Sequence, residues 1–317
     1  MTNTNSGRIQ RLDPRFDALI PAALSPEVLA DFSEREGPHW LEGPVWDRRA
    51  NYLLFSDVKA NAIYRWDCDQ GVSLFMQPSG YTGEQPFTGE EPGSNGLAFD
   101  SQGRLLICEH GDRRIRCLEA DGTKTVLADR YQDRRLNSPN DVACRSNGDI
   151  YFTDPPFGLP RQFDDPGREL MFSGVYRLST SGELTLLLDD LRAPNGIAFS
   201  ADEKTLYLAD GDQNRAAWLA YEVRDDRAVG NGRVLLDVTG VSGYGGPDGL
   251  EVDHLGNIFG AGREAVFVIA ADGTHLGTIP MGSITTNLGW GENGSTLFIT
   301  TERRLLRLRV STRGSGF

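Results

Sequence analysis

The chain has 317 residues, of which 39% are hydrophobic and 24% are charged, and this composition is typical of a globular protein with a sizeable core. Its formal net charge of -13 argues against nucleic acid as a partner, because nucleic-acid binding needs a basic face. No apolar run is long enough to cross a bilayer, and the N-terminal segment lacks the apolar core of a signal peptide. We therefore expect a cytoplasmic protein that does not bind membranes, with a periplasmic location as the alternative if a leader has been removed.

The cysteine content points away from a thiolate metal site. The four cysteines, Cys68, Cys108, Cys117 and Cys144, include no C-x-x-C pair, so a zinc site built on thiolates is not expected. Cys108 and Cys117 could in principle face each other across a hairpin. We instead expect reduced and buried thiols, because a free cysteine usually behaves as a small core residue.

Residues 1–26 are expected to contain one short helix. After this N-terminal segment, one sequence motif recurs along the chain. It consists of a polar residue, then small or apolar residues, and a second apolar strand begins about eight residues later. The leading polar positions are Glu42, Asn95, Asn140, Asn195, Asp248 and, less clearly, Thr286, separated by 53, 45, 55, 53 and 38 residues. Repeats of this length with short strands and Gly, Asp and Asn turns indicate a β-propeller.

The repeat count predicts an all-β, six-bladed β-propeller. A single repeat cannot bury both faces of its sheet, so the units should pack radially as one domain, residues 27–317, preceded by an N-terminal extension, residues 1–26. The segment 27–33, EVLADFS, should supply the outer strand of the last blade and close the ring. Two Gly- and Pro-rich stretches, 79–94 and 154–174, interrupt the repeats, and we expect them to form walls or lids at one mouth of the channel.

The first strand of each propeller blade lines the channel, so the leading polar residues should form a ring near one end of it. The alternative for each position taken alone is a simple turn, since Asn-Gly and Asp-Gly pairs are common turn formers. Glu42 favours the ring, because glutamate has no special role in turns. Carboxylate and amide oxygens without His or Cys suit a hard divalent cation. We expect Ca²⁺, with Mg²⁺, Mn²⁺ or Zn²⁺ as alternatives.

Taken in order, the motifs resemble those of a known family. EGPVW, NGLAFDSQGRLLICEHGDRR, SPNDVACRSNGDIYFTDPPFG, PNGIAFSADEKTLYLAD and PDGLEVDHLGNI resemble the gluconolactonase and regucalcin (senescence marker protein) family, most of all its bacterial gluconolactonase branch. The resemblance implies one divalent metal in the channel and hydrolysis of a sugar lactone, such as glucono-1,5-lactone, to the aldonic acid. The family's metal ligands fall on Glu42, Asn140, Asn195 and Asp248.

We assign further roles around this metal as hypotheses. Asp248 is the expected catalytic base, with a bare metal hydroxide and His110 as rivals. Asn95, His110 and Glu109 are expected to bind substrate, and Asp154 and Asp210 either cap turns or support the site. The predicted protein is therefore a lactonase, a carboxylic ester hydrolase of carbohydrate metabolism, that is a monomer or homodimer. The alternatives are an organophosphate or aryl-ester hydrolase on the same propeller, or a calcium-binding protein without activity.

Overall fold

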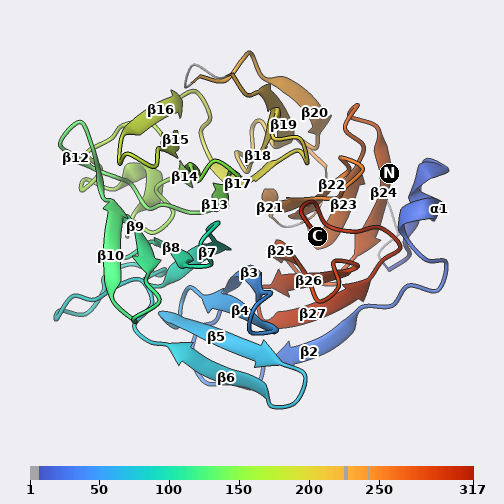
Figure 1. Ribbon diagram of the computed structural model, residues 1–317, viewed down its shortest axis with the longest axis horizontal. Coiled ribbons are helices and arrows are strands. Elements are labelled where there is room, and N and C mark those ends of the chain that lie inside the picture. The colour runs from blue at the N-terminus through green and yellow to red at the C-terminus, as the bar shows by residue number, and fades with distance from the viewer. Residues whose placement is uncertain (1–6, 225–227, 242, 244) are drawn as a thin grey trace.

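The computed structural model describes residues 7–224, 228–241, 243 and 245–317. Within them, six antiparallel sheets surround a central axis, and the chain runs around this axis once (Figure 1). Each sheet is one blade. Apart from β1 (Gln10–Arg11) and β2 (Glu27–Asp31), which add to the outer edges of the fifth and sixth blades, the strand nearest to the axis comes first in the sequence of every blade. The predicted all-β, six-bladed β-propeller is confirmed.

The blades have the following strands. The first three consist of β3 (Leu41–Asp47), β4 (Tyr52–Asp57), β5 (Ala62–Asp67) and β6 (Gly71–Met76); β7 (Ser94–Phe99), β8 (Leu105–Glu109), β9 (Arg114–Leu118) and β10 (Lys124–Ala128); and β13 (Val142–Cys144), β14 (Ile150–Asp154), β15 (Gly174–Leu178) and β16 (Leu184–Leu188). The fourth and fifth consist of β17 (Pro194–Phe199), β18 (Thr205–Asp210), β19 (Ala217–Glu222) and β20 (Arg233–Asp237); and β21 (Pro247–Val252), β22 (Ile258–Gly262), β23 (Ala265–Ile269) and β24 (His275–Pro280). The sixth contains β25 (Thr285–Gly291), β26 (Thr296–Thr301) and β27 (Arg304–Arg309), and a small hairpin of β11 (Arg130–Tyr131) and β12 (Arg134–Arg135) follows the second blade.

The second strand of each blade has an unusually apolar sequence, and its position in the fold explains why. β8, β14 and β22 are buried along their whole length, because each lies between two neighbouring blades. Sequences such as LLICE in β8 are therefore apolar at successive positions rather than at alternate ones. Between the second and third blades, for example, Cys108 and Leu106 share one core with Phe152 and Tyr176.

The ring is closed by a strand from the N-terminal part of the chain. β2 (Glu27–Asp31) pairs antiparallel with β27 as the fourth strand of the sixth blade, which confirms the prediction for the segment 27–33. Phe32, which directly follows β2, is fully buried, and its ring lies edge-on to Phe55 and Tyr64 in the first blade. This side chain therefore joins the last blade to the first.

The residues before β2 lie on the outside of the fifth blade. β1 (Gln10–Arg11) pairs with β24 and makes that sheet five-stranded, and the predicted short helix is α1 (Arg15–Leu19). Phe16 in this helix is fully buried against Gly277, where a Cβ atom would lie 2.5 Å from the phenyl ring. The division into an N-terminal extension and a propeller domain stays a prediction.

The two long connections lie together at one end of the channel. Residues 77–93 join β6 to β7, and residues 155–173, which include the 3-10 helix η1 (Gln162–Asp164), join β14 to β15. A Cβ atom on Gly89 in the first connection would lie 3.2 Å from the Cα atom of Pro160 in the second. These contacts agree with the prediction that the two stretches form walls at one mouth.

The cysteines are free, and Cys108 and Cys117 are buried as predicted. The prediction of a buried thiol was wrong at Cys68, which is exposed in the turn between β5 and β6, and Cys144 is only half-buried. Within the part of the chain that the structure describes, no helix is both long and apolar enough to cross a membrane.

Ring closure can be tested at Phe32. Phe32→Ala should lower the free energy of unfolding by about 3–5 kcal/mol, because it removes a buried aromatic side chain from the junction of two blades. Val28→Ala in β2, the strand that Phe32 follows, should cost only about 0.5 kcal/mol, because Val28 is 54% exposed. Urea unfolding followed by tryptophan fluorescence measures both. Equal losses for the two variants would contradict this account of ring closure.

Candidate metal centre and active site

The repeated polar residues stand where each innermost strand begins. Glu42, Asn95, Asn195 and Asp248 are the second residues of β3, β7, β17 and β21, and Asn140 lies two residues before β13. In those four strands the register with the neighbouring strand shifts at the polar residue or, for Glu42, just after it. Such a bulge re-aims the side chain, here toward the axis. We call these five residues the polar ring.

The residues that were expected to bind metal come together on the axis. Asn140 Nδ2 donates a hydrogen bond of 2.6 Å to Asn195 Oδ1, and Asn195 is hydrogen-bonded to the carboxyl group of Asp248. Glu42 lies close enough to Asp248 for its charge to raise the pKa of that residue. Glu42 Oε2 also accepts a hydrogen bond of 3.1 Å from Asn287 Nδ2. The predicted convergence of Glu42, Asn140, Asn195 and Asp248 is therefore present in the structure.

Electrostatics makes this convergence unfavourable unless a positive charge is supplied. Burial, reinforced by the charge of Asp141, raises the pKa of Glu42 to about 8. Burial, followed by the charges of Glu42 and Asp141, raises the pKa of Asp248 well above its usual range. The Glu91 carboxylate acts on both groups in the same direction. Buried carboxyl groups with negative neighbours favour a bound cation or protons in their place.

The donor set fits a hard divalent cation. Glu42 and Asp248 offer carboxylate oxygens, Asn140 and Asn195 offer amide oxygens, and Asn95 Oδ1 is a buried oxygen without a hydrogen-bond partner among the described residues. The residues that the structure describes contain no group of three or more His, Cys, Asp or Glu suited to a metal ion. The ring thus depends on amide oxygens as much as on carboxylates, as sites for Ca²⁺ often do.

A second layer of side chains lies directly behind the polar ring. The residue after each ring position is a glycine in four blades, but it is Asp141 in the third, and Asn287 follows Thr286 in the sixth. A Cβ atom on Gly96 would lie 2.5 Å from Asp141 Oδ1, and one on Gly249 would lie 1.9 Å from Asn287 Oδ1. The glycines therefore leave space in which Asp141 and Asn287 cross the channel.

These two side chains separate the polar ring from a cavity of ≈ 560 Å³ at the other end of the channel. The cavity is lined by later residues of the innermost strands and by residues 315–317, and Asp141 and Asn287 contribute to its lining. Among the described residues that line it there is no member of the polar ring. Glu251 also lines it, and burial raises the pKa of this residue to about 8.

His110 lies beside the ring and is fully buried. Its Nε2 atom is 3.2 Å from Asn140 Oδ1, and its Nδ1 atom is 3.0 Å from Glu91 Oε2. Both ring nitrogens therefore have protein partners. The predicted contact of His110 with substrate stays a prediction, and the structure adds a contact with the polar ring itself.

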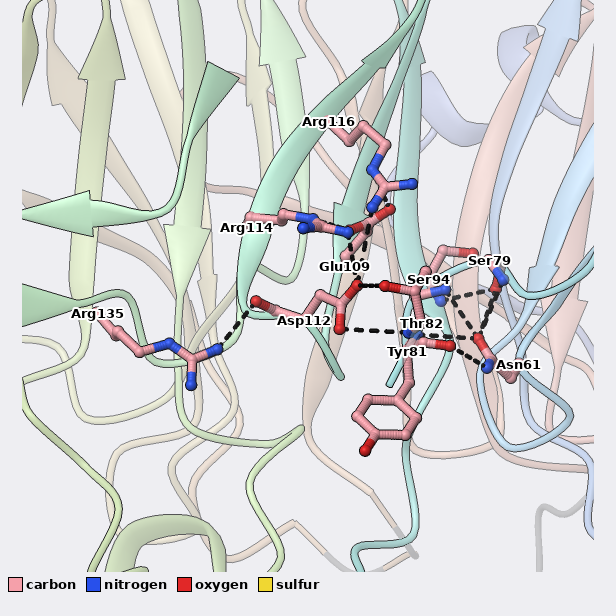
Figure 2. Close-up of polar contacts among 11 residues, drawn as sticks. Asn61, Ser79, Tyr81, Thr82, Ser94, Glu109, Asp112, Arg114, Arg116 and Arg135 are labelled. Atoms are coloured by element: carbon pink, nitrogen blue, oxygen red, sulfur yellow. Dashed lines mark hydrogen bonds and ion pairs between the residues drawn. The ribbon is translucent and has the colours of Figure 1, made fainter. Parts of the chain in front are cut away.

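Glu109, the neighbour of His110, is turned away from the ring. Its two carboxylate oxygens are paired with Arg114 and Arg116, and its side chain is 1% exposed (Figure 2). Burial raises its pKa to about 8 even with Arg114 beside it. The structure thus does not bring Glu109 to the polar ring, and a role in binding substrate stays a prediction without support from this geometry.

The aspartates that end second strands cap the preceding loops. Asp154 accepts hydrogen bonds of 2.8 Å from the N–H groups of Asn137 and Ser138, and Asp210 accepts one of 3.1 Å from that of Ala193. The capping alternative is therefore confirmed for both. Each aspartate fixes the loop that leads into the innermost strand of its blade.

Sequence reasoning missed three residues of the site and misplaced one. Thr286 has the expected register, but its hydroxyl donates to Leu41 O at 2.6 Å and lies 2.9 Å from Thr300 Oγ1, so Asn287 takes its place beside Glu42. Asp141 and Asn287 could have been found as the exceptions at a glycine position of the repeat. Glu91 carries no sequence signal, because it lies in a long loop.

The second layer can be tested at Gly249. Gly249→Ala should lower the free energy of unfolding by about 1–3 kcal/mol, because the added Cβ atom overlaps the Asn287 side chain. In an Asn287→Ala background the same change should cost much less, since the overlapping amide is gone. Urea unfolding of the four proteins measures the difference. An equal loss of unfolding free energy in both backgrounds would show that the added Cβ atom does not overlap Asn287.

Comparisons with known proteins give the family. Residues 40–303 match the model of the SMP-30/Gluconolactonase/LRE-like region. The chain is 36% identical over 326 residues to the gluconolactonase of Zymomonas mobilis, which covers 99% of this chain and 89% of that protein. A pentonolactonase from Haloferax volcanii is 27% identical over 268 residues, which are 82% of this chain and 80% of the relative.

Solved structures agree with this result. A gluconolactonase from Xanthomonas campestris superimposes with a TM-score of 0.82 and 31% sequence identity, covering 96% of this chain and 95% of that one. The match extends over all six blades, and the family model spans the polar ring from Glu42 to Asp248. The protein belongs to the SMP-30/gluconolactonase family.

Proposed function

We propose that this protein is a lactonase that hydrolyses a sugar lactone to the aldonic acid and depends on a divalent cation held by Glu42, Asn140, Asn195 and Asp248. The observation that carries the proposal is the meeting of two buried carboxyl groups and two amides at one end of the channel, surrounded by further negative charge. Relatives named as gluconolactonase and pentonolactonase support a sugar lactone as the substrate class.

Each residue of the polar ring then has its own role in the hydrolysis of the lactone. A divalent cation bound there would supply a Lewis acid that polarises the lactone carbonyl. Asp248 accepts a proton from the water that attacks the carbonyl carbon. It returns this proton to the ring oxygen as the bond between that oxygen and the carbonyl carbon breaks, which yields a carboxylic acid and a hydroxyl group. Asn95, with its unpartnered Oδ1, accepts a hydrogen bond from a substrate hydroxyl.

The more extensive hydrogen bonding of His110 and Glu42 favours Asp248 as the base, with Asn195 as a hydrogen-bond partner of Asp248. Both nitrogens of His110 are occupied, by Glu91 and Asn140. Glu42 Oε2 accepts hydrogen bonds from Asn287 and from its own neighbour, Gly43. A group that takes a proton from water needs an oxygen or nitrogen within reach of that water.

Acid release from glucono-1,5-lactone tests the activity. We expect hydrolysis above the spontaneous rate, loss of this excess when a chelator is added, and its return when Ca²⁺ is restored. A pH indicator follows the release of acid. Turnover of paraoxon-like esters alone would favour the ester-hydrolase alternative, and tight Ca²⁺ binding with neither activity would favour the calcium-binding alternative.

Asp248→Asn tests the base. The variant should lower kcat by about 10²–10⁴-fold, because general base catalysis contributes in this range, while some affinity for the cation remains. Lactone hydrolysis and Ca²⁺ titration calorimetry measure the two effects. Asp237→Asn is the control, because Asp237 is exposed and its carboxylate accepts a hydrogen bond from the N–H of Thr239. This change should leave lactone turnover and Ca²⁺ affinity unchanged. Near-normal turnover in Asp248→Asn would exclude Asp248 as the base.

A further inference from the structure

His110 is held from two sides by the long connections that cover the mouth. Glu91 in residues 77–93 contacts its Nδ1 atom at 3.0 Å. Gly158 in residues 155–173 approaches so closely that a Cβ atom there would lie 2.5 Å from the Cβ atom of His110. The histidine in turn contacts Asn140, a member of the polar ring, at 3.2 Å. A chain of direct contacts thus runs from a loop carboxylate to a proposed metal ligand.

The connection that carries Glu91 is fixed firmly at its start. Asn61 Oδ1 accepts hydrogen bonds from the N–H groups of Ser79, Gly80 and Tyr81 at 3.0, 2.8 and 3.2 Å. Figure 2 shows this group beside Asp112, which binds the Thr82 hydroxyl at 2.6 Å and is itself paired with arginines.

Its other end is fixed as well. The N–H of Gly93 donates to Val58 O at 2.8 Å, and the N–H of Ser94 donates to Ser79 Oγ at 3.0 Å, which ties the two ends of the connection together. The backbone N–H of His110 donates to Gly93 O at 3.1 Å. Glu91 lies two residues before Gly93, whose carbonyl group accepts this hydrogen bond from His110. The fixed backbone at Gly93 therefore restricts where the Glu91 carboxylate can lie.

Two adjacent glutamates in this connection differ sharply in environment. The Glu91 side chain is 20% exposed and meets His110, whereas the Glu90 side chain is 87% exposed and lies 3.9 Å from Lys59. Glu90 has no contact with the ring or with His110 among the interactions of the described residues. This pair provides a natural matched control.

We propose that Glu91 is a positioning residue, which fixes the rotation of the His110 ring and thereby the orientation of the Asn140 amide, whose oxygen His110 contacts. The inference rests on the proposed function for the identity of the ligand, but the link from Glu91 to His110 is a property of the protein itself. Outer partners that orient a metal ligand affect affinity or activity by about 10–100-fold. Glu91 also acts on Glu42 and Asp248 directly through its charge. The positioning effect is therefore the part of the change that disappears when His110 is absent.

A double-mutant cycle tests this with Ca²⁺ alone and with glucono-1,5-lactone. Glu91→Ala should weaken Ca²⁺ binding or lower kcat by about 10–100-fold, Glu91→Gln should lie closer to the wild type, and Glu90→Ala should match the wild type. In a His110→Ala background, Glu91→Ala should change the same quantity at least threefold less than it does in the wild type, because only the direct effect of its charge remains. An undiminished effect in that background, or no effect of Glu91→Ala at all, would overturn the proposal.

A readout without metal or substrate separates this proposal from the proposed function. In protein labelled with ¹⁵N-histidine, His110→Ala identifies the imidazole signals of His110 among those of the four histidines. Glu91→Ala and Glu91→Gln should shift these signals, and Glu90→Ala should not. Unmoved signals would refute the positioning role. If the signals move but the wild type neither binds Ca²⁺ nor hydrolyses lactone, the proposed function fails and the link between Glu91 and His110 stands.

Discussion

Glu42 and Asp248 begin different blades, yet they face each other in a space where the neighbouring charges of Asp141 and Glu91 are also negative. The propeller forces this meeting, because closing the ring brings the innermost strands of all blades to one axis. Folding therefore concentrates carboxyl groups at the cost of their hydration. The cation proposed for this point would offset that cost, because the carboxylate and amide oxygens of the polar ring lie around it.

The walls of the channel are built by two devices that recur from blade to blade. A bulge at or next to the polar residue turns its side chain to the axis in four blades. A glycine in the next position leaves room for the two larger side chains, Asp141 and Asn287, that cross the channel. Together they confine the polar ring to one end and leave the cavity at the other end separate from it. The same repeat thus forms both the polar ring and the layer of Asp141 and Asn287 behind it.

The long connections belong to the site as much as the blades do. The start of the first connection is anchored by Asn61 and Asp112, whose side chains accept hydrogen bonds from backbone N–H groups of residues 79–82. Through His110 they contact both each other and the ring. The geometry of the proposed metal ligands is therefore set partly by segments outside the repeat.

Periodicity is enough to predict the six blades and the meeting of Glu42, Asn95, Asn140, Asn195 and Asp248, because equivalent positions of a propeller share one axis. The choice of Glu42, Asn140, Asn195 and Asp248 as metal ligands came from the resemblance to a family. Tertiary structure alone decided which residues fill the space between these positions. It substituted Asn287 for Thr286, placed Asp141 across the channel, directed Glu109 to arginines and brought Glu91 onto His110. Those outcomes depend on side-chain packing and on loop paths, which have no period in the sequence to reveal them.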